Sequence, residues 1–154
     1  MTNFSSTPDD PLQDELEAIE RTMLQVGWAT HRQLAHELSE FNLTVPQYTA
    51  MKALQNMGDN RTMSELADAA RQISATMTGI VDRLVERSLL TRQRDPADRR
   101  SLRVSLTDEG RQLLNAIQQK KRIRLRRFLE QLTPAERQDF IRLLQKYLQT
   151  VYGS

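Results

Sequence analysis

The chain has 154 residues, which is enough for one domain with a sizeable core, and its 38% hydrophobic and 27% charged residues are typical of a soluble globular protein. It contains no cysteine, which excludes a disulfide framework, a thiolate zinc site and a cysteine redox switch. The net charge of +2 is small, and without a membrane-length apolar run or a signal peptide at the start we expect a cytoplasmic protein with no membrane partner.

The first part of the chain predicts two helices. Residues 1–11 are polar and contain two prolines, so we expect a disordered lead-in. Apolar residues then recur at spacings of three and four up to Leu38, which predicts a long amphipathic helix within residues 12–41. Pro46 suits the first turn of a second helix, and Gly58 marks its end.

Two further helices are predicted on either side of a tight break at residues 71–73. Thr62 and Glu65 have the spacing of a capping box at the start of the first, and Ser74 is a good N-cap for the second. The expected inward face of the second helix consists of Met77, Ile80, Val81, Leu84 and Val85, and the outward face of Thr76, Thr78, Gly79, Asp82, Arg83, Glu86 and Arg87.

After Ser88 the apolar period changes from 3.6 to 2. Residues 90–94 and 101–106 therefore predict a β-hairpin whose connection reads RDPADRRS. Thr107 is expected to cap a long helix running to Leu132, and Thr133 with Glu136 predicts a capping box for a last helix.

This order of elements predicts a mainly α fold with a small β-hairpin, in a single unit over residues 12–154. A helix–break–helix followed by a hairpin is a winged helix-turn-helix, here at about residues 45–110. Its second helix enters the major groove of DNA, and its hairpin tip reaches the neighbouring groove or the backbone. We therefore interpret the arginines of the tip as DNA contacts, although in isolation they would be read as residues that aid solubility.

The stretch MSELADAARQISATMTGIVDRLVERSLLTRQ is followed by Asp98-Arg99-Arg100 and then by Val104, Leu106, Thr107 and Gly110. In this combination the chain resembles the MarR family of bacterial transcription regulators over essentially its whole length. The resemblance implies that residues 12–41 and 111–154 form dimerisation helices flanking the DNA-binding lobe. It also implies a homodimer on pseudo-palindromic double-stranded DNA, usually a repressor that a small aromatic or phenolic effector releases.

The resemblance assigns DNA contacts by position. Arg100 would enter the minor groove, with Arg99 beside it and Asp98 as its supporting carboxylate. A narrow A·T-rich minor groove concentrates negative potential, which arginine exploits. Hydroxyls and methyls can read base edges, and the expected major-groove residues are Ser74, Ala75, Thr76 and Thr78. The expected backbone contacts are Thr62, Ser64, Arg71 and Arg83.

Two positions depart from the pattern of the family. Gly79 stands where some relatives carry a base-reading arginine, so recognition by this chain leans more on DNA shape. Ser88 stands where many relatives have glycine, so this serine must adopt the left-handed conformation or the helix must end differently.

Several charged positions have more than one interpretation. Residues 1–70 hold eleven acidic and four basic groups, whereas residues 111–127 hold seven basic groups and no acidic one. The run KKRIRLRR at Lys120–Arg127 could bind nucleic acid, compensate the acidic first helix or attract anionic ligands, and we favour the second. Arg83 and Arg87 could contact phosphates or pair with Glu86 and Asp82 on their own helix.

Trp28, His31, Tyr48 and Met51 could line an effector pocket, although core packing is the more common role of such residues. His31 and His36 do not share a helical face, and His36-Glu37 lacks the second histidine of a metalloprotease motif, so we predict no metal site and no cofactor. No nucleophile–base pair or phosphate-binding glycine loop is visible, which argues against an enzyme. The alternative function is a winged-helix module that binds protein instead of DNA.

Overall fold

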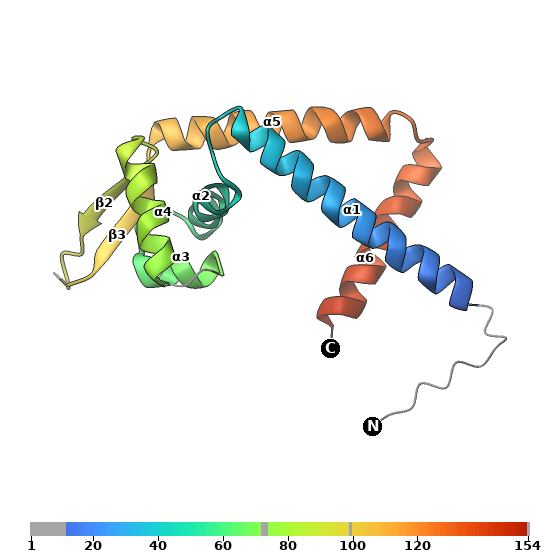
Figure 1. Cartoon of the computed structure of the whole chain (residues 1–154), viewed down its shortest axis with the longest axis horizontal. Coiled ribbons are helices and arrows are strands. Elements are labelled where there is room, and N and C mark those ends of the chain that lie inside the picture. The colour runs from blue at the N-terminus through green and yellow to red at the C-terminus, as the bar shows by residue number, and fades with distance from the viewer. Residues whose placement is uncertain (1–11, 72–73, 99, 154) are drawn as a thin grey trace, which may run out of the picture. The chain divides into compact units, whose positions relative to one another are not determined.

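The computed structural model describes residues 12–71, 74–98 and 100–153, which are mainly helical with one small sheet (Figure 1). The chain divides into two compact units, residues 1–49 and 50–154, which we describe separately. The predicted lead-in, residues 1–11, lies outside the described residues. Within the described ranges, none of the helices combines the length and the apolar character needed to cross a membrane.

The first unit contains the long helix predicted from the apolar spacing, α1 (Gln13–Ser39). Asn42 then takes a positive φ of 53°, and the Leu43 amide donates to the Leu38 carbonyl at 2.9 Å, which ends the helix in a turn. α2 (Val45–Met57) begins in this unit and continues into the second. The Gln47 side chain accepts from the Thr44 amide at 2.9 Å at its start, so the predicted second helix is confirmed.

The second unit opens with the rest of α2, which ends before Gly58 with its φ of +84°. A two-residue strand, β1 (Arg61–Thr62), leads into α3 (Met63–Ala69). The predicted capping box is confirmed. The Thr62 hydroxyl accepts from the Glu65 amide at 3.2 Å, and the Glu65 carboxylate accepts from the Thr62 amide at 2.8 Å.

α4 (Ser74–Glu86) starts one residue earlier than predicted, because Ser74 is its first helical residue and not its N-cap. Its predicted inward face is buried, except for Val85, which is half-buried. At its end Ser88 adopts the left-handed conformation, with a φ of 58°. The Leu89 amide donates to the Leu84 carbonyl at 2.9 Å, which closes a Schellman motif. Serine therefore occupies the conformation in which glycine would be unstrained.

The predicted hairpin is confirmed as β2 (Leu90–Arg94) and β3 (Leu102–Leu106), which pair antiparallel with Leu90 opposite Leu106. β1 adds a third strand on the other side of β3, giving the order β1-β3-β2. The sequence did not predict β1, because two residues are too few to show an alternating pattern. The central strand carries Val104 into the core, where it is fully buried.

Two helices complete the unit. α5 (Asp108–Leu129) is capped by the Thr107 hydroxyl, which accepts from the Gly110 amide at 2.9 Å, and it ends before the predicted Leu132. α6 (Pro134–Tyr152) begins with the predicted capping box. The rings of Phe128 and Phe140 pack edge to face, with centroids 5.6 Å apart, where α5 turns into α6.

The core of the second unit lies among α2, α3, α4, the sheet and the start of α5. Its members are large apolar side chains with almost no exposure, and they come from the inward positions of every one of these elements. They are Met51, Leu54, Leu66, Met77, Val81, Leu84, Leu90, Val104, Leu114 and Ile117. This shared core holds α4 and the hairpin in one rigid frame.

Candidate nucleic-acid interface

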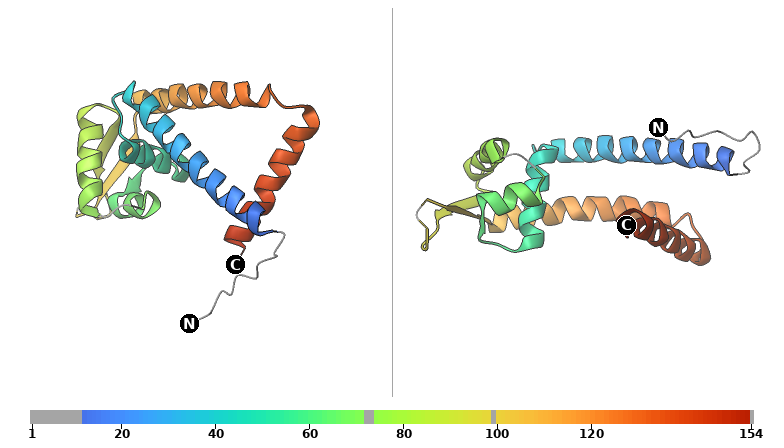
Figure 2. Two further views of the ribbon diagram at one scale, coloured as in Figure 1. Left: turned by 45° about the vertical axis from the view of Figure 1, so that its right-hand side comes forward. Right: turned by 90° about the horizontal axis from the view of Figure 1, so that it is seen from below.

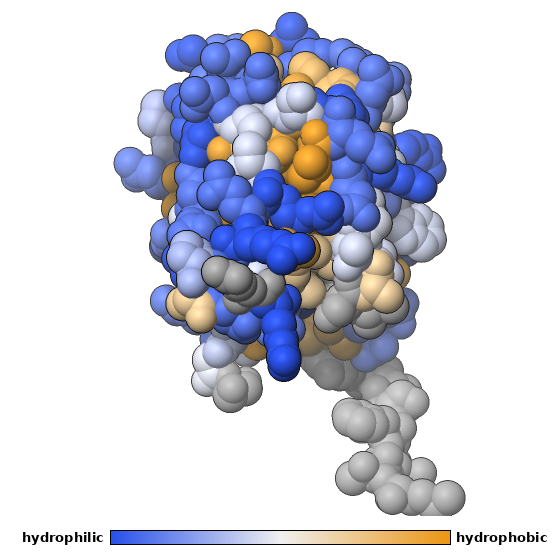
Figure 3. Space-filling model, turned by 90° about the vertical axis from the view of Figure 1, so that its left-hand side faces the viewer, coloured by the Kyte–Doolittle hydropathy of each residue, from blue (hydrophilic) through white to orange (hydrophobic). Residues whose placement is uncertain are grey.

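The outward face of α4 offers small and hydroxyl side chains. Ala75, Thr76, Thr78 and Gly79 are all exposed, while the opposite side of the helix is buried in the core. A Cβ built on Gly79 would meet no atom within 4 Å, so packing does not require glycine there. The end of the molecule that carries this helix and the hairpin is covered mainly by hydrophilic side chains (Figure 3). The side chain of Ser74 lies outside the described residues.

The hairpin forms the wing, which we define as residues 90–106. Its two strands run together away from the helices to a tip (Figure 2). Arg94 and Arg100 are exposed, and neither side chain makes a hydrogen bond or an ion pair with another described residue. The Asp98 carboxylate accepts from the Arg100 amide at 3.0 Å. Asp98 therefore shapes the backbone of the tip, and Arg99 lies outside the described residues.

A second carboxylate, that of Asp95, holds the start of the wing tip in place. Asp95 is buried, with 6% of its surface exposed, and its Oδ1 accepts from the Ala97 amide at 2.9 Å. Its Oδ2 accepts from the Arg103 Nε at 2.6 Å. Arg103 also donates to the Asn60 carbonyl at 2.9 Å, and so ties the wing to the turn before α3. The sequence did not predict this pair, although Asp-Pro at the start of a loop signals such a turn.

The environment of Asp95 favours its charged form. The hydrogen bond from the Ala97 amide, followed by that from the Arg103 guanidinium, lowers the pKa of Asp95 below its ordinary value, and burial opposes the shift only in part. Asp95 is therefore a carboxylate at neutral pH. A carboxylate that accepts from both a backbone amide and an arginine holds its loop in one conformation.

An acidic residue of α4 pairs with the wing. Asp82 accepts a hydrogen bond from Arg92 of β2, which links the helix to the wing. Neither Arg83 nor Glu86 makes an ion pair with another described residue, so of the two interpretations of Arg83 the pair within its helix is not formed in this structure. Arg83 is exposed on the same side of α4 as Gly79. Its guanidinium is available to a phosphate.

The other expected backbone contacts lie around α3. The Thr62 hydroxyl is occupied, because it accepts from the Glu65 amide and donates to the Glu65 carboxylate at 3.0 Å. Ser64 is exposed in the first turn of α3. Arg71 is exposed in the break between α3 and α4, with a φ of 53°.

The four expected effector residues occupy different environments. Trp28 and His31 are exposed on α1, and Trp28 has 71% of its surface exposed. Tyr48 and Met51 are buried on α2. Trp28, His31 and Tyr48 belong to the first unit and Met51 to the second.

Comparison with known proteins places this architecture in a family. The profile of the MarR family matches residues 41–101, which run from the turn before α2 to the tip of the wing. The transcriptional regulator HosA of Escherichia coli O111:H- is 34% identical over 113 residues, or 73% of this chain and 82% of HosA. The chain belongs to the MarR family. It is thus a DNA-binding transcriptional regulator of the winged-helix type, as its sequence predicted.

Two further comparisons describe relatives of this MarR-family protein. The transcriptional repressor NicR of Pseudomonas putida is 40% identical over 75 residues, which cover 49% of this chain and 47% of NicR. The solved structure of a MarR family protein from Bacillus stearothermophilus superposes with a TM-score of 0.80 over 90% of this chain and 96% of that chain, at 24% identity. This last likeness supports the fold.

Proposed function

We propose that the protein is a homodimeric repressor that binds pseudo-palindromic operators with α4 in the major groove and the wing in the minor groove. One observation carries the proposal. A helix face of small and hydroxyl residues and a wing whose Arg94 and Arg100 have no side-chain partner among the described residues belong to the same compact unit and share its core. Such a unit holds the groups that contact bases and the groups that contact phosphates at fixed positions relative to one another.

The chemistry of the α4 face suits direct contact with bases. Ala75 and the methyls of Thr76 and Thr78 can meet the methyl of thymine, and hydroxyls can bond base edges or phosphates. Gly79 leaves a gap beside them into which DNA can approach. Ser74 completes the proposed major-groove set.

The wing supplies the contact to the minor groove. The guanidinium of Arg100 is exposed, and its backbone is held by Asp98 at the tip, while Asp95 and Arg103 hold the base of the tip. A narrow A·T-rich groove attracts such an arginine strongly because its negative potential is concentrated. Arg99 would extend the same basic tip, and Arg71, Arg83, Ser64 and Thr62 would contact the backbone.

The proposals of a homodimer and of repression have separate support. Large apolar side chains of α1, α5 and α6 are exposed in the single chain, as expected of a surface that a second copy covers. The similarity to the repressor NicR supports a role in repressing transcription. The family resemblance supports release of the protein from DNA by an aromatic or phenolic effector. Trp28, His31, Tyr48 and Met51 remain the proposed effector residues.

The proposal is tested by selecting bound duplexes from a random DNA pool with the wild type and Arg100→Ala in parallel. Arg127→Ala is the matched control, because Arg127 is also an exposed arginine without a described side-chain partner, but lies on α5. We expect the wild type and the control to enrich the same A·T-rich inverted repeat. Arg100→Ala should bind that repeat about 10- to 100-fold more weakly.

Other outcomes would redirect the assignment. Equal affinity of Arg100→Ala and the wild type would remove the wing from the interface. Enrichment of no duplex, together with a stable protein partner in pull-downs, would favour the protein-binding alternative. A reporter placed under the selected operator should be expressed more strongly when the gene for the protein is deleted. Weaker expression after the deletion would contradict repression.

A further inference from the structure

One side of β2 faces α4 and the core, and we call it the inner face of the strand. Leu90 is buried in the core, and Arg92 reaches Asp82 of α4. Successive side chains of a strand point to opposite sides, so Arg94 projects from the same side as Leu90 and Arg92. Arg94 is the last residue of the strand, and it is therefore the member of the inner face that lies nearest to the tip.

The pairing of β2 with β3 agrees with this division. Val104, which lies opposite Arg92, is buried in the core. Gln93 and its partner Arg103 lie on the other side of the hairpin, which we call the outer face. The buried positions of both strands therefore belong to the side that carries Arg94, and the Arg103 guanidinium belongs to the opposite side.

Acidic side chains beside the wing are engaged by arginines other than Arg94. Asp82 accepts from Arg92 on the inner face, and Asp95 accepts from Arg103 at the outer face. Arg94 is exposed, and its guanidinium makes no hydrogen bond or ion pair with another described residue. The inner face therefore presents a positive charge that the described part of the wing does not neutralise.

Arg94 lies between the two elements that we propose to contact DNA. β2 runs back alongside α4 after the turn at Ser88, and the pair of Asp82 and Arg92 holds the strand against the helix (Figure 1). Two residues of a strand span about 6.6 Å, so Arg94 lies about that distance beyond Arg92 in the direction of the tip. Its guanidinium thus faces the space between α4 and the tip that carries Arg100.

The shape of B-DNA decides what occupies this space in a complex. A major groove and the minor groove beside it are separated by one sugar–phosphate strand. When α4 lies in the major groove and the tip lies in the neighbouring minor groove, that strand passes between them, next to the inner face of β2. An arginine at this position contacts phosphate oxygens, to which its planar guanidinium can donate two hydrogen bonds at once.

We propose that Arg94 binds a phosphate of the strand between the two grooves and so fixes the position of the wing along the DNA. This role rests on the proposed function, because it requires α4 and the tip to occupy neighbouring grooves. Phosphates are the same in every sequence, so Arg94 contributes affinity and register without selecting bases. Arg100, in contrast, contributes a preference for a narrow A·T-rich groove.

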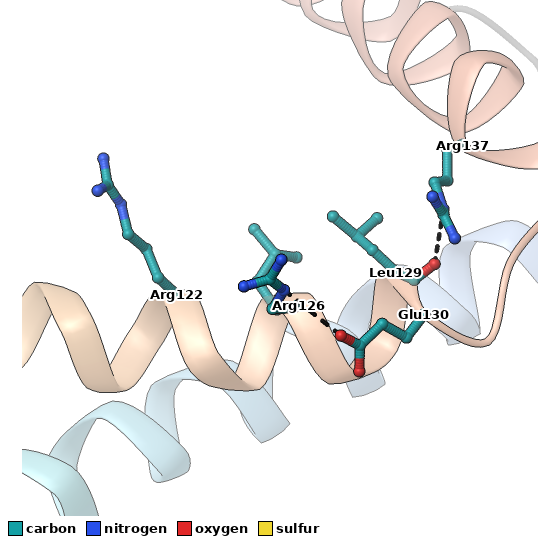
Figure 4. Close-up of a pocket in the computed structure, with 6 residues that line it drawn as sticks. Arg122, Arg126, Leu129, Glu130 and Arg137 are labelled. Carbon is teal, nitrogen blue, oxygen red and sulfur yellow. Dashed lines mark hydrogen bonds and ion pairs between the residues drawn. The ribbon is translucent and has the colours of Figure 1, made fainter. Parts of the chain in front are cut away.

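Arginines elsewhere in the same unit provide the control. Beside the turn from α5 into α6, Arg126 lies 3.4 Å from Glu130 in an exposed ion pair (Figure 4). The neighbouring Arg127 is exposed, and its side chain makes no hydrogen bond or ion pair with another described residue. Arg127 thus matches Arg94 in charge and exposure but lies on α5, and Arg127→Gln controls for the loss of one positive charge.

The test measures binding of the full chain to two duplexes of equal length, the operator selected from the random pool and an unrelated sequence. Arg94→Gln removes the charge, and Arg94→Lys keeps it. The outer-face variant, Thr91→Arg with Arg94→Gln, keeps the net charge but moves the guanidinium to the side of the strand opposite Ser105. Fluorescence anisotropy at a series of salt concentrations gives the affinity and its salt dependence.

We expect Arg94→Gln to bind both duplexes about tenfold more weakly at moderate salt, and by the same factor. The slope of log affinity against log salt should become shallower by about 0.9 for each bound copy. Arg94→Lys should retain most of the affinity, because an ammonium also binds phosphate. The outer-face variant should bind as weakly as Arg94→Gln, and Arg127→Gln should bind like the wild type.

Other outcomes would overturn the phosphate contact. Wild-type affinity in the outer-face variant would show that only the net charge of the wing matters. A loss confined to the selected operator would mean that Arg94 contacts bases. Wild-type affinity in Arg94→Gln would remove this residue from the interface and leave the proposed function intact. A wild type that binds neither duplex would overturn the proposed function, and the contact with it.

Thermal unfolding of each variant separates a lost contact from a lost fold. The Arg94 side chain is exposed and without a partner among the described residues, so its replacement should leave the unfolding temperature unchanged. If glutamine destabilises the strand, Arg94→Thr provides the same test, because threonine favours strands and carries no charge. Weak binding with an unchanged salt slope in both variants would contradict the contact.

Discussion

Asp95 and Arg103 bridge the base of the wing tip, with 2.6 Å between Oδ2 of the aspartate and Nε of the arginine. Asp95 directly follows β2 and Arg103 lies in β3, and Arg103 also donates to the Asn60 carbonyl beside β1. The tip that carries Arg100 is therefore connected to the rest of the unit by side-chain contacts as well as by the backbone hydrogen bonds between β2 and β3.

The first prediction concerns this bridge. Asp95→Asn retains the size of the side chain but removes the charge that holds Arg103 and the Ala97 amide. We expect operator affinity to fall on the order of tenfold, because the tip no longer holds Arg100 in one position. Fluorescence anisotropy with a labelled operator measures the loss. Wild-type affinity in this variant would show that the tip does not need its anchor.

The second prediction concerns acid. Hydrogen bonds from Thr62 lower the pKa of Glu65, those from Thr133 lower the pKa of Glu136, and those from Ala97 and Arg103 lower the pKa of Asp95. A carboxyl with a lower pKa in the folded state stabilises the fold at pH values above its unfolded pKa, and loses that contribution as pH falls through its folded value. The ordinary values are 4.5 for the glutamates and 3.8 for the aspartate.

The free energy of unfolding, measured by urea titration, should therefore decline as the pH is lowered from about 5. Asp95→Asn should make this decline shallower, and adding Glu136→Gln should make it shallower still. A decline of the same steepness in the wild type and the double variant would show that these carboxyls do not cause it.

The third prediction uses the left-handed end of α4. Ser88 has a φ of 58°, which costs an L-residue about 1 kcal/mol relative to glycine. Ser88→Gly should raise the free energy of unfolding by about that amount. Gly58→Ala is the matched reverse change, because Gly58 has a φ of +84° and a Cβ there meets only the end of the Arg61 side chain. Gly58→Ala should lower the free energy of unfolding. Thermal unfolding of both variants measures whether the first change stabilises the fold and the second destabilises it.

The fourth prediction concerns Gly110 in the first turn of α5. A Cβ at this position would overlap the Leu89 carbonyl oxygen, because the first turn of α5 lies directly against the turn between α4 and β2. Gly110→Ala should destabilise the fold by about 1–3 kcal/mol through overpacking against backbone. Gly79→Ala should instead be neutral or stabilising, since nothing surrounds that site. Similar losses in the two variants would contradict the close approach at Gly110.

Local rules predicted most of the elements from the sequence. The caps at Thr62, Thr107 and Thr133 depend on residues three positions away, so their hydrogen bonds follow from the chain order itself. The buried face of α4 and the strands of the wing likewise follow from apolar periods of 3.6 and 2. The family resemblance came from the order of these elements together with the residues of the wing.

Only the tertiary structure decided the partners of charged residues that are distant along the chain. Arg92 pairs with Asp82, ten residues away, and Arg103 reaches Asn60, 43 residues away. The strand β1 forms because its backbone can hydrogen-bond to the free edge of β3. Ser88 adopts a left-handed φ because the chain must turn there for Leu89 to enter the core. A sequence pattern records the preference of each side chain for water or for the core, whereas an ion pair depends on where the packed elements bring two side chains together.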